Sequence, residues 1–347
     1  MGTSSPPPFT PSSLQQETSV TRLDDATFSA HLSPAYCIGT VHNGGYVASV
    51  FLRAAKAYMT PRGQPDAVAV HWQFLSRTQA GPAVLKVAET KMGRGMSVLH
   101  MTLHQRGLVP ETPWLRPAED GEAEGGPSPA VVAYVTNTNM DTEAGISLPT
   151  GWTLSYPPPA VDLARLGQRS RSGGGGDEGD ANWKRMYIGL MKRLPMLNNL
   201  EYYMPRAGHP LPATQDLWIR FANGEPFSDT SLGFVADAVA AMLLEAYRRA
   251  KPSGGDNSSR KSAAAGFWYP TVSMSLEVKK KLPPQGAQWL RLRAAAKVIR
   301  NGRFDAQLLV FDVDDELVAM SSQVAMAVDL ARNFANRGQP PRSRGKL

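Results

Sequence analysis

Cysteine is almost absent from this sequence, and long apolar runs are absent altogether. A single cysteine, Cys37, excludes a disulfide framework and a cysteine-based zinc site, and it fits a reducing compartment. No apolar run approaches the roughly 20 residues of a membrane-spanning helix, and the first residues lack the apolar core of a secretory signal peptide. We therefore expect a cytoplasmic protein without a membrane span. The terminal Gly345-Lys346-Leu347 resembles the peroxisomal Ser-Lys-Leu signal except in its first residue.

Familiar catalytic and metal-binding motifs are also missing. The six histidines are scattered. His100 and His104 would lie about 13 Å apart on an expected strand, which is too far to share a metal. No HExxH or GxSxG motif occurs, and the four glycines at 173–176 lack the preceding strand and the spacing of a phosphate-binding loop. The sequence therefore predicts no metal site, no cofactor, and no serine or cysteine triad.

Acidic residues are fewer than basic ones, 30 against 37, so the net charge is +7. This excess favours anionic partners without choosing among them. Residues 279–303 hold many basic side chains and no acidic one. On a strand, Trp289, Arg291, Arg293 and Lys297 would share one face, which we interpret as solvated; attraction of a phosphate is the alternative. Because aromatic and base-reading side chains do not alternate there, we expect no nucleic-acid partner.

The most informative stretch is an apolar segment with one charge in its middle. Residues 230–249 predict a buried helix, because every residue from 233 to 244 is apolar or glycine except Asp237. A buried ionised carboxylate is costly unless it is hydrogen-bonded or its pKa shifts. Asp237 is therefore a candidate functional residue. The alternative is an acid favoured by the helix dipole, although Asp229 or Thr230 is the better N-cap.

This segment has a counterpart near the N-terminus. The sequence Gly45-Tyr46-Val47-Ala48-Ser49 corresponds to Gly233-Phe234-Val235-Ala236-Asp237, and both runs continue as alanine-rich apolar segments. A helix at 44–59 is expected in the first copy, and strand-like segments follow both runs. The pattern predicts two copies of one α+β unit, with an acid in the second copy where the first has a serine.

Composition divides the chain into successive parts. We expect a disordered N-terminus at 1–20, a first repeat at 21–140, a connector at 141–199, a second repeat at 200–330 and a tail at 331–347. The first repeat carries an insertion at 110–129. The connector has a low-complexity stretch at 170–180 and an expected amphipathic helix at 183–193. The second repeat contains a loop at 251–264.

The repeated helices and three short sequences together resemble the thioesterase-like superfamily of double-hotdog proteins. The three sequences are Trp268-Tyr269-Pro270-Thr271, Asn301-Gly302-Arg303 and Leu317-Val318-Ala319. Bacterial acyl-CoA thioesterase II is the best-known branch of this superfamily, and the similarity to it is distant. The resemblance implies hydrolysis of an acyl thioester carried by CoA or by a carrier protein. It also implies a site made of Asp237, Thr271 and Gln323. Our repeat alignment places Ser49, Ala67 and Asn137 at the matching positions of the first copy.

In the mechanism implied by the resemblance, Asp237 takes a proton from water while Thr271 and Gln323 orient that water. Backbone N–H groups at Gly44, Gly45 or Gly233 are candidates for holding the oxyanion. Two alternatives remain open at this point. One is a double hotdog that binds an acyl ligand without hydrolysing it. The other is a hydratase, for which His42 is the histidine to watch. Homo-oligomerisation is compatible with the sequence.

Overall fold

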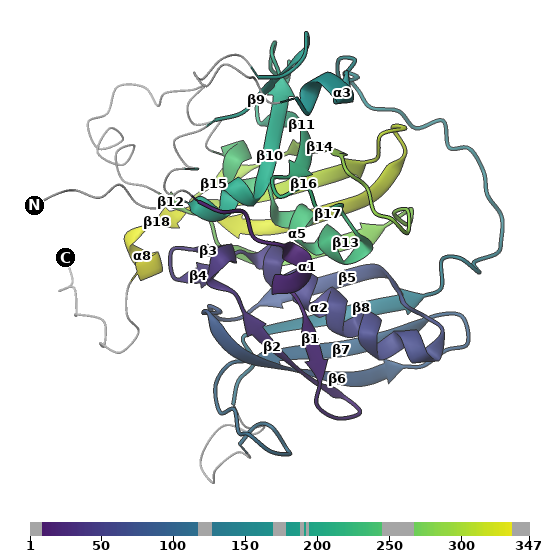
Figure 1. The fold of residues 1–347 in the computed structure, drawn as a ribbon, viewed down its shortest axis with the longest axis vertical. Helices are drawn as coiled ribbons and strands as arrows, with labels where there is room; N and C mark the ends of the chain where they lie inside the picture. The colour runs from purple at the N-terminus through teal and green to yellow at the C-terminus, as the bar shows by residue number, and fades with distance from the viewer. Residues whose placement is uncertain are drawn as a thin grey trace, which may run out of the picture.

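One long antiparallel sheet runs through both halves of the chain (Figure 1). The computed structural model describes residues 9–116, 127–168, 178–187, 191, 194–244 and 267–334. The sheet contains β1 (Val20–Arg22), β2 (Thr27–Leu32), β5 (Asp66–Phe74), β6 (Gly81–Lys91), β7 (Ser97–His104), β8 (Val131–Thr138), β9 (Trp183–Arg185), β10 (Leu200–Pro205), β11 (Thr214–Phe221), β13 (Thr271–Val278), β14 (Leu290–Ala295), β15 (Ile299–Arg300), β16 (Arg303–Phe311) and β17 (Leu317–Met326). Their order is β1-β2-β6-β7-β8-β5-β13-β17-β16-β14-β11-β10-β9, with β15 beside β16.

The strand order shows that the two halves repeat one topology. The sequence β2-β6-β7-β8-β5 in the first half corresponds to β11-β14-β16-β17-β13 in the second, and β5 pairs with β13 at the centre. In each half a helix precedes the central strand and is covered by the sheet. This confirms the predicted α+β double-hotdog arrangement.

Strand register corrects one part of the repeat alignment. The β5 ladder shifts between Ala67 and Ala69, and the β13 ladder shifts at the matching place between Thr271 and Ser273. Ala67 therefore corresponds to Thr271, as predicted. Across the ladder Ala67 faces Asn137 and Thr271 faces Ala325. By this register Asn137 corresponds to Ala325, two residues from Gln323, so the predicted match of Gln323 with Asn137 is wrong.

The two central helices differ in length. The first, α2, spans Gly44–Met59 as predicted, and the Asn43 side chain caps it by accepting a hydrogen bond from Tyr46 N. The second begins with the 3₁₀ turn η4 (Asp229–Ser231) and continues as α5 (Leu232–Asp237). The chain then bends at 238–239 before a helical stretch at 240–244. The prediction of one continuous helix over 230–249 is therefore wrong at this bend, and residues 245–249 lie outside the described residues.

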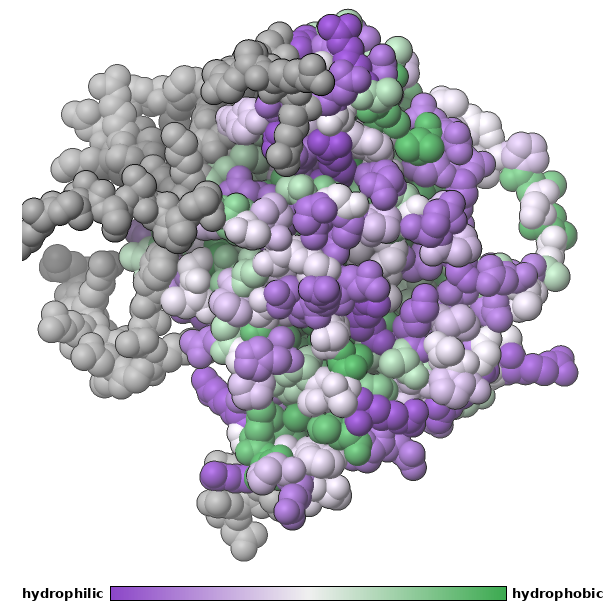
Figure 2. Space-filling model, in the orientation of Figure 1, coloured by the Kyte–Doolittle hydropathy of each residue, from purple (hydrophilic) through white to green (hydrophobic). Residues whose placement is uncertain are grey.

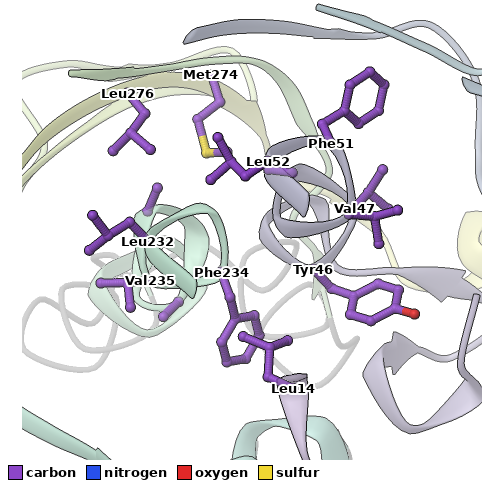
Figure 3. Packing of buried hydrophobic residues seen from close by; sticks show 14 of the residues in the cluster. Leu14, Tyr46, Val47, Phe51, Leu52, Leu232, Phe234, Val235, Met274 and Leu276 are labelled. Carbon is purple, nitrogen blue, oxygen red and sulfur yellow. The ribbon is translucent and has the colours of Figure 1, made fainter. Parts of the chain in front are cut away.

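Helices α2 and α5 pack side by side beneath the sheet (Figure 3). Leu52 of α2 and Leu232 of α5 lie close to Met274 and Leu276 of β13, and all four side chains belong to the main hydrophobic core. Because the side chains around this contact are mainly apolar, a polar side chain buried there must find its partners within the protein.

Shorter elements surround this core. They are α1 (Leu14–Glu17), η1 (Pro34–Tyr36), β3 (Cys37–Ile38), β4 (Val41–His42), η2 (Thr60–Arg62), α3 (Leu163–Leu166), η3 (Pro195–Asn199), β12 (Phe267–Trp268), β18 (Val328–Asp329) and α8 (Ala331–Phe334). The predicted disorder at 1–20 is wrong for the end of that segment. Leu14 is buried in the core, and Ser13 Oγ donates to Glu225 at 2.6 Å. Residues 1–8 lie outside the description.

Two predictions about the connector and the low-complexity stretches can also be judged. Residues 183–185 form strand β9, which pairs with β10, so the predicted helix at 183–193 is wrong there. The stretch at 251–264 falls outside the described residues, as do 117–126 of the insertion at 110–129 and 170–177 of the stretch at 170–180.

The basic strand face in the second half is covered at its two arginines, while Lys297 is exposed. Arg293 is 8% exposed; its guanidinium donates at 2.8 Å to each carboxylate oxygen of Asp216 and at 2.7 Å to the carbonyls of Ser155 and Tyr156. Arg291 is buried as well, at 2% exposed. The predicted solvated face is therefore wrong for these two arginines. The connector folds back over β14 and its carbonyls satisfy a guanidinium that would otherwise require water.

The lysines at 279–281 are balanced locally. Lys279 pairs with Glu277, Lys280 with Asp312 and Glu316, and Lys281 with Asp66 and Asp141. They follow the end of β13 that is opposite to Thr271, about 23 Å away at the usual rise per strand residue. These pairs give no basis for attraction of a phosphate at the lysines.

The visible surface of the protein is mixed in polarity. Figure 2 shows a mostly hydrophilic face on which hydrophobic residues gather in small groups. In the connector, Ile146 is 91% exposed and Leu148 is exposed as well. Within the described residues, no helix is long and apolar enough to cross a membrane.

Candidate active site

The Asp237 carboxylate lies where the end of α5 meets the start of α2. Its Oδ2 accepts hydrogen bonds from Asn43 Nδ2 at 2.8 Å and from Gly45 N at 3.0 Å. Its Oδ1 accepts from Thr271 Oγ1 at 2.9 Å. The carboxylate therefore has donors from a side chain, a helix N-terminus and a strand. The α2 N-terminus also places the positive end of a helix dipole beside it.

Glycine permits this close approach of the two helices. A Cβ on Gly45 would lie 2.8 Å from Asp237 Cβ and 2.8 Å from the carbonyl oxygens of Gly233 and Phe234. A Cβ on Gly233 would lie 2.7 Å from Ser49 N. Both distances are below van der Waals contact, so each helix needs a glycine where it faces the other. The paired glycines in the sequence repeat thus fix the distance between Asp237 and the start of α2.

Ser49 of α2 makes the equivalent hydrogen bond to the backbone of α5. Its Oγ accepts a hydrogen bond of 2.9 Å from Phe234 N in the first turn of α5. In the repeat, Ser49 corresponds to Asp237, and each side chain receives a backbone N–H from the opposite helix. The predicted difference between the copies therefore has a structural meaning: both polar groups join the helices, and only one is ionisable.

Burial governs the ionisation of Asp237. Desolvation raises the pKa of its carboxyl to about 6, although hydrogen bonds from Thr271, Gly45, Gly44 and Asn43 each lower it. The cost of removing the charge from water thus exceeds the gain from these donors. A carboxyl with this pKa is ionised at neutral pH, yet it accepts a proton far more readily than an ordinary aspartate, as a general base requires.

Asp237 opens onto a pocket of about 310 Å³ between the two halves. Apolar side chains form much of its lining, among them Ile38, Val41, Val47, Phe74 and Val272. Thr271 and Asn43 line it beside Asp237, and the aromatic residues Trp268 and Tyr269 complete one side. A concave, mainly apolar pocket with a few converging polar groups is typical of a small-molecule site.

The structure brings two of the three predicted site residues together. Asp237 and Thr271 are hydrogen-bonded and both line the pocket. Gln323 lies on the inward face of β17, opposite Met274 and two residues from Ala325, which faces Thr271. It does not line the pocket or bond to either residue. Its side chain is 6% exposed, and Gln323 Oε1 has no hydrogen-bond partner among the described residues. A buried acceptor in that state is unusual in a folded protein.

The backbone groups expected to hold an oxyanion are engaged elsewhere. Gly45 N donates to Asp237, and the N–H of Gly44 also stabilises that carboxylate. Gly233 packs against Ser49 inside the helix contact and does not line the pocket. The start of α2 therefore holds the Asp237 carboxylate in this structure.

His42 is buried beside the pocket and is neutral. Its Nε2 lies 3.0 Å from the carbonyl of Ser33, so Nε2 carries the proton, and its ring stacks on Tyr46. Burial lowers its pKa to about 4. The conjugate acid is therefore stronger than that of Asp237, which makes His42 the weaker base of the two near neutral pH.

Asn43 is the site residue that sequence reasoning missed. It joins two functions, since Oδ1 caps α2 through Tyr46 N and Nδ2 donates to Asp237. Its only signal in the sequence is an asparagine placed directly before Gly44-Gly45 at the start of an apolar helix, as an N-cap should be. Among the described residues, no group of three or more His, Cys, Asp or Glu side chains is arranged to hold a metal ion.

Known proteins resemble this chain over most of its length. Residues 32–138 match the acyl-CoA thioesterase N-terminal domain, and residues 169–327 match the acyl-CoA thioesterase C-terminal domain. The thioesterase-like protein TwmA of Talaromyces wortmannii is 35% identical over 339 residues, which cover 93% of this chain and 94% of TwmA.

Solved structures share the fold at low sequence identity. A hot dog fold protein from Alicyclobacillus acidocaldarius has a TM-score of 0.64 and 17% identity, covering 91% of this chain and 97% of its own. The acyl-CoA thioesterase II TesB2 of Mycobacterium marinum has a TM-score of 0.57 and 15% identity, covering 94% of this chain and 99% of its own. At these identities the similarity is one of fold.

Proposed function

We propose that this chain, which belongs to the acyl-CoA thioesterase family and is a thioester hydrolase, hydrolyses acyl-CoA thioesters with Asp237 as general base. The observation that carries the proposal is the Asp237 carboxylate itself. It is buried, it is held by Asn43, Gly45 and Thr271, and it faces a pocket with an apolar lining. A raised pKa at such a carboxyl is a common property of catalytic acids and bases.

The chemistry asks for a base and a positioned water. Asp237 takes one proton from the water as the water oxygen attacks the carbonyl carbon of the thioester. The carbon–sulfur bond then breaks, and the thiolate leaves with its electron pair and is protonated by Asp237 or by solvent. Because a thiol has a pKa near 8.5, the leaving group needs little acid catalysis. The products are a carboxylic acid and a free thiol.

Two side chains position that water in the proposal. Thr271 Oγ1 donates its proton to Asp237 Oδ1, so the hydroxyl oxygen still has lone pairs that accept a hydrogen bond from water. Gln323 lies outside the described pocket lining, two residues along β17 from the partner of Thr271, and its buried Oε1 is without a partner among the described residues. An acceptor of this kind would hold the second proton of the water or an N–H of the substrate.

The pocket supports an acyl group joined to an anionic carrier. Its apolar wall suits an acyl chain, and among the described residues its charged lining consists of Arg77, Arg332 and Asp237. CoA carries several phosphates, which arginine binds well. The same lining is compatible with a phosphopantetheine-bound acyl group on a carrier protein, so the assay below includes both.

A screen of acyl-CoAs of different chain length with detection of the released thiol tests the function. We expect thiol release that depends on chain length. Thiol release only from an acyl-carrier protein would show that the carrier protein, and not CoA, delivers the acyl group. Tight binding of an acyl-CoA in calorimetry, with no thiol released from any substrate, would show that the protein binds acyl groups without hydrolysing them. That result would contradict the proposal.

The pH dependence follows from the pKa of Asp237. The base must be ionised, so kcat/KM should be level above pH 6 and fall by about tenfold per pH unit below it. Initial rates between pH 4.5 and 8 measure this profile, and Thr271→Val, which removes a hydrogen bond that lowers the pKa of Asp237, should move its inflection to higher pH. A profile that stays level down to pH 4.5, as the pKa of an ordinary aspartate would give, would contradict the role of the buried carboxyl.

A further inference from the structure

A short hairpin before α2 forms one wall of the pocket. Strands β3 and β4 pair into a two-stranded sheet of their own, and Ile38, Val41 and His42 line the pocket. The hairpin leads directly into Asn43, which holds Asp237. Because an isolated hairpin has little stability in water, and this one has strands of two residues each, its position must come from other segments.

The C-terminal helix α8 provides that support, although it lies at the other end of the sequence. Figure 1 shows α8 beside β3 and β4. Asn333 Oδ1 accepts from Thr40 N at 3.1 Å, and Asn333 Nδ2 donates to the carbonyl of Ile38 at 2.9 Å. The carbonyl of Asn333 accepts from Thr40 Oγ1 at 3.0 Å. These three bonds hold both sides of the turn between β3 and β4.

Asn333 is buried more completely than most polar residues in this protein. It is 1% exposed, although it belongs to a helix of only four residues. A buried amide group destabilises the fold when its oxygen or its nitrogen lacks a partner. The two side-chain bonds of Asn333 therefore favour one position of the hairpin. Replacing it removes bonds to two residues of the hairpin at once.

The same segment also belongs to the pocket. Arg332 lines it, and Arg77 donates to the carbonyls of Asn333 and Arg332 and lies over the Trp268 ring at 4.9 Å. Thus α8, the hairpin and the chain around Arg77 meet around one cavity. A change in the position of α8 would move its walls, while Asp237 keeps its own bonds to Gly45 and Thr271.

We propose that Asn333 is a positioning residue that clamps the β3–β4 hairpin as a wall of the substrate pocket and so sets selectivity for the acyl group. It acts through the hairpin and not on the reacting atoms. The proposal rests on the proposed hydrolysis only for its kinetic readout. If a long acyl chain reaches this wall and a short one does not, as the proposal requires, the two substrates should respond differently when the clamp is removed.

Amide hydrogen exchange tests the clamp without any substrate. In Asn333→Ala we expect the amides of residues 38–42 to exchange about tenfold faster, because the hairpin loses its fixed partner. Thr40→Val removes only the hydroxyl bond and should give a smaller change of the same kind. Asn223→Ala, which removes the acceptor for Glu225 N in an exposed loop, should leave the hairpin unchanged. Unchanged exchange in both clamp variants would overturn the proposal.

Kinetics with acetyl-CoA and decanoyl-CoA test selectivity. For Asn333→Ala we expect the KM of decanoyl-CoA to rise about tenfold with kcat within about threefold, while acetyl-CoA hydrolysis changes little. An equal loss of kcat for both substrates would place Asn333 in the support of Asp237 and overturn the selectivity role. If the wild-type protein releases no thiol at all, the proposed function fails, and the exchange data still decide whether Asn333 holds the hairpin.

Discussion

Asp237→Asn should lower the rate of thioester hydrolysis by about 10²–10⁴-fold, the usual contribution of a positioned general base. Asparagine has the same shape but cannot take a proton from water. Its amide oxygen can replace Oδ2 as acceptor for Asn43 and Gly45, and its amide nitrogen can donate to the hydroxyl oxygen of Thr271. The variant should therefore fold with the site intact.

The same substitution should not weaken folding near neutral pH. The folded-state pKa of Asp237, about 6, lies above its ordinary value of 3.8. Folding therefore favours the protonated form of Asp237. The stabilisation of the folded state by this form is fully present below pH 3.8 and is lost as the pH rises through about 6. The difference corresponds to about 3 kcal/mol of penalty for the ionised form. Asp237→Asn removes this penalty, so its melting temperature at pH 8 should equal or exceed that of the wild type.

Three further variants serve as controls for this result. Thr271→Val and Gln323→Ala should reduce the rate less than Asp237→Asn, because each proposed contact only orients the water. Ser49→Ala removes the acceptor for Phe234 N and should cost about 1 kcal/mol of stability with little change in kcat. A folded Asp237→Asn protein with the wild-type rate would show that the base lies elsewhere.

Gly45→Ala should have the largest effect on stability, a loss of about 3 kcal/mol or more. Alanine is favoured over glycine in a helix by up to about 1 kcal/mol, so propensity alone would predict a gain. Here the added Cβ would lie 2.8 Å from Asp237 Cβ and from two backbone oxygens of α5. None of these atoms is the end of a flexible side chain, so the helices must move apart.

Moving the helices apart should also impair catalysis, because Gly45 N is a donor to Asp237. Thermal unfolding and kcat, measured on the same preparation, check both effects. Gly95→Ala is the matched control, since a Cβ there meets no atom within 4 Å, and it should leave both quantities unchanged. A Gly45→Ala protein as stable as the control would mean that the helices do not touch as described.

Local sequence patterns were sufficient to predict the features that depend on a single segment of the chain. Asp237 stood out because a charge interrupts an apolar run, and α2 ends where the apolar pattern ends. The repeat further linked Thr271 to Ala67, and the strand ladders agree. The burial of Asp237, the extent of α2 and the match of Thr271 with Ala67 were predictable because burial and periodicity are visible in neighbouring residues.

Features that depend on distant segments could not be found in this way. Arg293 looks solvent-exposed on its own strand, yet the carbonyls of residues 155 and 156 and the carboxylate of Asp216 enclose it. The register of Gln323 depends on ladder shifts in β13, and the bend after Asp237 is invisible in a uniformly apolar run. The partnership of Asn43 with Asp237 joins residues 194 positions apart.

A single turnover in water labelled with ¹⁸O tests the central claim most directly, because it follows the attacking oxygen. If Asp237 acts as a base, the label enters the released carboxylic acid, and the peptide that contains Asp237 keeps its normal mass. If Asp237 instead attacked the thioester itself, hydrolysis of the resulting anhydride could leave the label on its carboxylate. Labelled acid with an unlabelled Asp237 peptide is the result we predict; label in that peptide would contradict the mechanism.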